Sequence, residues 1–256
     1  MKLKQLFEAL FEFNTDVDYI YNIAFKKFID DVDSGKKPHE YEIMTGRDVE
    51  LKRLSSSDLK SSDCMRSDLA NSIEIVCGVF RSGNYYNPRA RKIQLSLNLS
   101  VVQYKYNPSI FDLTSSQVLT IVNEVTENRI KSSISHELSH WVDDTSHNYF
   151  LGKLLSRANE FNNSEILKLK KHDVNMTYFE IQGQIHGIAS LKRTYKGNWD
   201  ELTLADLFRL YTSLSSINDN LNTRYGNDIS KIWQKYLVKR MSREGLLGKN
   251  MKNFVK

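Results

Sequence analysis

The chain has 256 residues, 40% of them hydrophobic and 26% charged, so it can bury a substantial core and should fold without disulfide staples. Its two cysteines, Cys64 and Cys77, are too few for a disulfide framework and fit no paired-cysteine metal motif. No apolar run approaches the roughly 20 residues that span a bilayer, and the N-terminus lacks the apolar core of a secretory signal peptide. Composition therefore excludes a small secreted disulfide scaffold and a transmembrane protein, and it predicts a soluble protein.

The first predicted element is an amphipathic helix over residues 16–31, because its apolar positions recur at helical spacing. The predicted buried stripe consists of Val17, Ile20, Ala24, Phe25, Phe28 and Ile29. Residues 33–72 are rich in Ser, Asp and Lys and contain two glycines and a proline, which favours loops with one short helix.

Two β-strands are predicted next, at residues 73–80 and 93–100. The first run is apolar and β-branched. The second alternates strictly, with Ile93, Leu95, Leu97 and Leu99 on one face and Gln94, Ser96, Asn98 and Ser100 on the other. We expect the two strands to pair antiparallel across a loop at residues 81–92.

A long helix is predicted from Thr114 to Val142, because this run has no Pro or Gly and repeats apolar residues every three or four positions. Near its end lies an HExxH motif, His136-Glu137-Leu138-Ser139-His140. Residues four apart share a helix face, so both imidazoles can bind one zinc ion while the carboxylate lies beside the position left for water. The motif therefore predicts two zinc ligands, His136 and His140, and a catalytic base, Glu137.

A catalytic zinc needs a third protein ligand, and Glu180 is the predicted one. It lies in a predicted helix with Gly183 one turn away on the same face, where a small residue lets two helices come close. His147 and His186 are the alternatives, because imidazole also binds zinc well. His186 lies well over 90° around the helix from Glu180.

Asp143 and Asp144 follow the second motif histidine by three and four residues. Either carboxylate could accept the distal N–H of a ligand imidazole and fix its tautomer. Asp143 is the residue assigned to this supporting position.

Further helices are predicted at residues 150–158, 166–171, 178–192, 202–214 and 228–241. The lack of a repeat or low-complexity linker predicts one domain over residues 16–256, after an N-terminal tail at residues 1–15. The expected fold class is α+β and predominantly helical, with a small antiparallel sheet before the motif helix.

The net charge of +5 is concentrated at residues 231–256, where eight Lys and Arg residues face one acid, Glu244. Trp233 and Tyr236 interleave with these cations, as in some nucleic-acid-binding segments. The spacing also fits an amphipathic helix that turns Leu237 inward and leaves its charged face in solvent. The second interpretation is favoured, so nucleic acid is not an expected partner.

The stretch SSISHELSHWVDD at residues 132–144, followed by YFEIQGQI at residues 178–185, resembles the gluzincin zinc metallopeptidases. It is closest to the compact phage and bacterial type with HELxHW and a downstream ExxA, although Gly183 replaces the usual alanine. Only residues 129–193 carry this resemblance. It implies a zincin-like fold, with His136, His140 and Glu180 as zinc ligands and Glu137 as general base.

The resemblance also implies a role for the strand at residues 93–100. It would be the edge strand that holds an extended peptide substrate by backbone pairing. Gln94, Ser96 and Asn98 are then the candidate substrate-binding residues.

The N-terminal residues 1–10 look like the targeting peptides of head-internal proteins in large T-even-type phages. Those peptides end at a Leu-x-Glu cleavage site, which Leu6-Phe7-Glu8 matches, although an ordinary helical turn explains the same letters. This resemblance implies a phage protein and leaves open whether residues 1–8 are removed. The lack of a membrane span and of a signal peptide leads us to expect a location in the host cytoplasm or inside the virion.

The expected function is that of a zinc-dependent endopeptidase that hydrolyses a peptide or protein substrate with metal-activated water and Glu137 as general base. The alternative is a phage virion structural or host-interaction protein whose metal site is stabilising or inactive, with a phage head or host protein as partner. A closed site with four side-chain ligands would favour the alternative, because it leaves no position for water.

Overall fold

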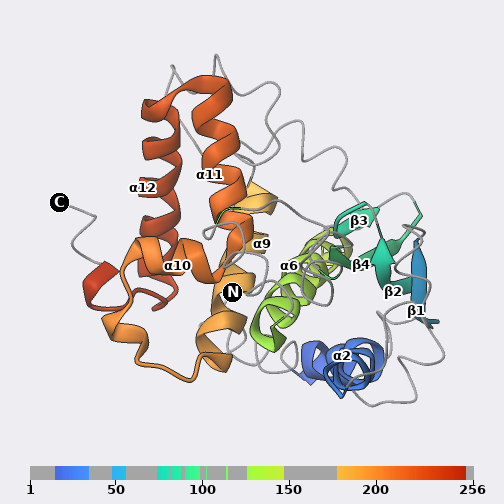
Figure 1. The fold of residues 1–256 in the computed structure, drawn as a ribbon. Coiled ribbons are helices and arrows are strands. Elements are labelled where there is room, and N and C mark those ends of the chain that lie inside the picture. The colour runs from blue at the N-terminus through green and yellow to red at the C-terminus, as the bar shows by residue number, and fades with distance from the viewer. Residues whose placement is uncertain are drawn as a thin grey trace. The chain divides into compact units, whose positions relative to one another are not determined.

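A computed structural model of the chain (Figure 1) describes residues 15–34, 48–55, 74–80, 82–87, 90–98, 102, 114, 126–146 and 178–251. The chain divides into two compact units, Met1–Trp141 and Val142–Lys256. The prediction of one domain from residue 16 onward stays a prediction, and the proposed cleavage site and the helices at 150–158 and 166–171 lie outside the described residues. Within the described ranges, no helix combines the length and hydropathy that crossing a bilayer requires.

The described part of the first unit opens with a helix from residue 15, as the sequence predicts. Residues 15–21 are α-helical, Asn22–Lys26 form the wider π-helix η1, and Lys27–Asp33 form α2. The predicted apolar stripe is confirmed, because all six of its residues are buried. Its η1 segment packs against strands β1 and β2, so the stripe covers part of a sheet.

The sheet has four strands in the order β1-β2-β4-β3. These are Val49–Leu54 (β1), Glu74–Phe80 (β2), Tyr85–Asn87 (β3) and Lys92–Asn98 (β4). The predicted apolar face of the last strand is confirmed, since Ile93, Leu95 and Leu97 are buried. Cys77 of β2 is a buried free thiol, and its burial raises the pKa of that thiol.

The predicted antiparallel pairing of the two main strands is wrong. β2 and β4 run parallel, with Ile75 opposite Ile93 and Val79 opposite Leu97. The reason lies in residues 81–92, which were expected to be a loop but contain β3. The chain reverses into β3, and it reverses again at Ala90 and Arg91, where Asn87 Oδ1 accepts the Ala90 N–H at 3.1 Å. The sheet is therefore mixed, and the α+β, mostly helical class is confirmed.

Strand β4 is not the edge strand that the gluzincin resemblance implied. β2 lies on one side of it, and β3 pairs with Lys92, Ile93 and Gln94 on the other side. Beyond β3, the Ser96 N–H donates to Asn84 Oδ1 at 2.6 Å, so this backbone group is also occupied. The outer position beside β2 is taken by β1, a strand that the sequence did not predict.

The motif helix, α6, spans Glu127–Ser146 and is shorter at its start than predicted. Neither Thr114 nor Thr126 is helical. The Thr126 carbonyl accepts the backbone N–H groups of Arg129 and Ile130, which starts the helix there. The predicted start at Thr114 is therefore wrong.

The second unit is helical over its described residues. It contains α9 (Tyr178–Thr194), η8 (Trp199–Glu201), α10 (Leu204–Leu210), α11 (Thr212–Tyr225) and α12 (Asn227–Arg243). The predicted helices at 178–192 and 228–241 are confirmed. The helix predicted at 202–214 is interrupted at Tyr211, and α11 continues through a Ser- and Asn-rich run because Leu214, Ile217 and Leu221 are buried at helical spacing.

Lys131 ties the motif helix to the N-terminal helix. Its side chain is only 10% exposed, and its ammonium lies 2.8 Å from the Asp18 carboxylate and 2.6 Å from the Glu127 carboxylate. The same ammonium lies 4.9 Å from the centre of the Tyr21 ring. Burial lowers the pKa of Lys131, but hydrogen bonds to the two carboxylates outweigh it and the pKa is raised.

We predict that Lys131→Met lowers the free energy of unfolding by about 1–2 kcal/mol, because it leaves two carboxylates without their shared cation. A raised folded-state pKa means that this contribution is fully present below the ordinary lysine pKa and is lost only as the pH rises through the raised value. The loss should therefore be equal at pH 6 and pH 9 in urea unfolding followed by circular dichroism. Lys27→Met, at an exposed lysine of α2, is the matched control and should change stability by less than about 0.5 kcal/mol. Equal losses in both variants would contradict the assignment.

Candidate metal centre

Helix α6 is buried on nearly every side, and its three faces have different chemistry. Ile130, Ile134, Leu138 and Trp141 form an apolar stripe, and all four are buried. Ser132, Ser135 and Ser139 form a second buried face of small residues. Two of these serines hydrogen-bond to the helix itself, Ser132 to the Asn128 carbonyl and Ser139 to the His136 carbonyl, each at 2.7 Å.

The third face carries the ionisable groups of the motif. His136, Glu137 and His140 are 8%, 6% and 7% exposed. Burying imidazoles and a carboxylate costs free energy unless they are hydrogen-bonded or bind a metal ion. The burial of these three side chains is therefore consistent with a metal ion bound beside α6.

The two imidazoles converge through their Nε2 atoms. His136 Nε2 and His140 Nε2 are 3.0 Å apart. The ring centres are 4.7 Å apart and the ring planes are nearly perpendicular, at 86°, so the rings meet at their edges rather than stack. One turn of α6 thus brings the two nitrogens of the motif to the same point.

This separation fits a shared zinc ion. Two nitrogens at the usual zinc distance, placed at tetrahedral angles, lie about 3.3 Å apart. The observed Nε2–Nε2 distance of 3.0 Å is close to that value. Two imidazoles and a carboxylate are also a donor set that zinc prefers, whereas magnesium and calcium prefer oxygen donors alone.

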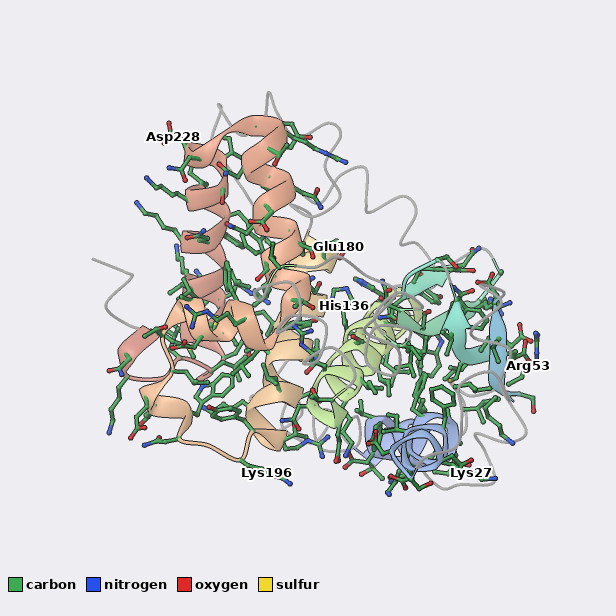
Figure 2. All side chains as sticks on the ribbon, in the orientation of Figure 1. Lys27, Arg53, His136, Glu180, Lys196 and Asp228 are labelled. Atoms are coloured by element: carbon green, nitrogen blue, oxygen red, sulfur yellow. The ribbon has the colours of Figure 1, made fainter. Side chains whose placement is uncertain are left out.

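Glu180 belongs to the same group of ligand atoms. Among the described residues, His136, His140 and Glu180 are the group of side chains that could hold a metal ion, and one ligand atom from each lies within 4.8 Å of the others. Glu180 lies in the first turn of α9 and is partly exposed. Figure 2 labels it together with His136. The group is the one predicted from the sequence, and it could bind a metal ion.

The rival histidine on α9 has a different environment. His186 Nε2 lies 3.1 Å from the amide nitrogen of Gln182. Gln182 Oε1 in turn accepts a hydrogen bond from Arg240 of α12 at 2.5 Å, and Arg240 lies 3.9 Å from the Glu244 carboxylate. This network attaches α9 to α12, and His186 takes part in it rather than in the metal-binding group.

The remaining predicted site residues have different outcomes. His147 lies outside the described residues, as does the side chain of Asp143. Asp144 is fully buried and lies on α6 one turn beyond His140, and the assignment of the supporting position to Asp143 stays a prediction. Helical spacing alone had left the two aspartates equivalent.

The candidate substrate residues of β4 make contacts within their own unit. The Gln94 amide donates to Ser82 Oγ at 2.7 Å and to the Gly83 carbonyl at 3.3 Å. Ser96 Oγ accepts the Phe80 N–H at 3.0 Å. Asn98 is exposed at the end of the strand. Their role in substrate binding stays a prediction.

Comparison with known proteins adds no further assignment: no family model, curated protein or solved structure matches this chain. The site is therefore characterised by its own residues and geometry.

We predict that the purified protein binds about one zinc ion per chain and that Glu180→Ala weakens zinc binding by more than the roughly 10- to 100-fold that residues outside the ligand set cost. The affinity is measured by competition with a chromophoric chelator, and zinc content by elemental analysis. His140→Ala should behave like Glu180→Ala.

His186→Ala and His147→Ala are the discriminating controls and should retain zinc. If either of them loses zinc while Glu180→Ala keeps it, the third ligand is that histidine and the assignment of Glu180 is wrong. Circular dichroism spectra establish that each variant is folded.

Proposed function

We propose that the chain is a zinc-dependent endopeptidase. One observation carries the proposal: two buried imidazoles from adjacent helical turns converge at 3.0 Å, beside a buried glutamate. Among the residues that the structure describes, the candidate ligands number three, one fewer than a tetrahedral zinc requires, and in the proposal water takes the fourth position. Sites with three protein ligands and one open position are typically catalytic, whereas structural zinc sites are closed.

The chemistry follows from the positions of the protein groups. Bound zinc supplies a Lewis acid, which makes water available as a nucleophile near neutral pH and polarises the carbonyl of the scissile bond. Glu137 precedes His140 by three residues on α6, and residues three apart share a helix face, so its carboxylate is on the side of the His140 imidazole. In the proposed reaction Glu137 accepts a proton from the attacking water and then delivers it to the nitrogen of the departing amine.

Asp144 has a supporting part in this proposal. A fully buried carboxylate one turn beyond His140 adds negative charge close to the bound cation. Such a group also raises the basicity of a ligand imidazole if it accepts that imidazole's distal N–H. The proposed substrate is a peptide or protein, and the gluzincin and T-even phage resemblances of the sequence support this choice.

We predict that Glu137→Gln retains zinc but lowers the rate of peptide hydrolysis by roughly 10²- to 10⁴-fold, because glutamine cannot accept the proton of the water. Zinc content and cleavage of a fluorogenic peptide library are measured on the same preparation. Glu127→Gln, the same change at an exposed position of α6, is the matched control and should leave the rate within about twofold.

Two results would argue against the proposal. A Glu137→Gln protein that cleaves peptides as fast as the unchanged chain would exclude Glu137 as the base. An unchanged chain that holds zinc tightly yet cleaves no member of the library would favour the alternative, a virion structural or host-interaction protein with an inactive metal site.

A further inference from the structure

Four basic side chains form a line along the exposed side of α12: Lys231, Lys235, Lys239 and Arg243. All four are exposed. Successive members are four residues apart, so they lie about 6 Å apart along the helix axis and the line is about 18 Å long. Figure 2 shows nitrogen-tipped side chains that project outward along α12 from the end marked by Asp228. We call this line the cationic row.

The charges of the cationic row are not neutralised within the part of the chain that the structure describes. No carboxylate there forms an ion pair with any of its four members. Other helices do pair their charges at three- or four-residue spacing, as in Lys26–Asp30 at 2.6 Å and Asp206–Arg209 at 3.2 Å. On α12 itself, Glu244 lies near Arg240, which is outside the row.

This arrangement costs stability. Like charges four residues apart on a helix destabilise it, and the row contains three such pairs. The helix tolerates the repulsion because its opposite side is packed, with Trp233, Leu237 and Met241 fully buried. A sequence that keeps uncompensated repulsion on a helix surface points to a binding role, because an anionic partner relieves it.

The burial of the apolar side excludes one kind of anionic contact, the insertion of α12 into a lipid surface. A helix that binds a lipid surface inserts its apolar face between the headgroups. The apolar face of α12 is occupied by the core of its own unit, which includes Trp233, Leu237, Val238 and Met241. Only the charged side is available, and it can act through electrostatic contact alone.

We propose that the cationic row binds the phosphate backbone of nucleic acid without sequence preference. Lysine ammonium groups are flexible point charges that suit phosphate oxygens, and three of the four members are lysines. A linear array of cations matches a linear array of phosphates, and its affinity comes from released counterions. The sequence favoured a merely solvated face, but exposure of all four cations without carboxylate partners supports a binding face. This proposal is independent of the metal centre.

The test is binding of the full chain to a fluorescein-labelled 20-base-pair DNA duplex, measured by anisotropy at 50–300 mM KCl. Three to four phosphate contacts predict that the logarithm of the association constant falls against the logarithm of the salt concentration with a slope of about −3 to −4. Affinity should then fall about 100-fold between 50 and 200 mM salt. Replacing all four members of the row by Gln should bring the slope close to zero.

The single variant Lys235→Gln is the second measurement and should make the slope less negative by about 1, with the fold unchanged by circular dichroism. A matched control removes four exposed cations on other elements and should keep the slope of the unchanged chain. Its substitutions, all to Gln, are at Lys27, Lys52, Lys196 and Arg224.

Three outcomes would overturn the proposal. The unchanged chain fails to bind the duplex at 50 mM salt, the row variant binds like the unchanged chain, or the scattered control loses as much affinity as the row variant. Flotation with phosphatidylserine vesicles is the parallel arm. Vesicle binding without duplex binding would assign the row to a lipid surface instead.

Discussion

The structure depends on one constraint, the burial of two imidazoles and a carboxylate on consecutive turns of α6. Such groups are stable inside a protein only when hydrogen bonds or a metal ion satisfy them, and the imidazoles belong to a group that could hold a metal ion. The other two faces of α6 are also buried: the apolar stripe packs in the core, and the small serines of the second face permit close approach of neighbouring segments.

Local periodicity predicted the elements whose burial is regular. The first helix, β2, β4, the motif helix, α9 and α12 all repeat apolar residues at the spacing of their structure, so the sequence identified them. Strand β1 escaped prediction because it exposes charged residues and buries only Leu54. Strand β3 has three residues, too few for any periodic signal, and missing it reversed the inferred direction of β4.

The residues of the candidate site that lie on one helix could be predicted from the sequence, whereas those from other segments were less certain. His136 and His140 follow from the geometry of a helix, and the third ligand required a further choice between residues on different segments. The phase of α9 separated Glu180 from His186, and the structure groups Glu180 with the motif. Asp143 and Asp144 follow His140 by three and four residues, so both lie within reach of its face and helical spacing does not separate them. The edge position of β4 depends on which strands flank it, which is a property of the whole sheet and was predicted wrongly.

The two charged features of the molecule follow different electrostatic rules. At the metal centre the groups are buried, so their interactions are strong and each side chain depends on the others. On α12 the cations are in water, where the Debye length is about 8 Å at physiological ionic strength. Neighbours about 6 Å apart in the cationic row therefore influence each other, whereas its ends, about 18 Å apart, do not. The row should act as a series of nearly independent contacts, whereas we expect removal of one side chain from the candidate metal centre to weaken metal binding by the other side chains.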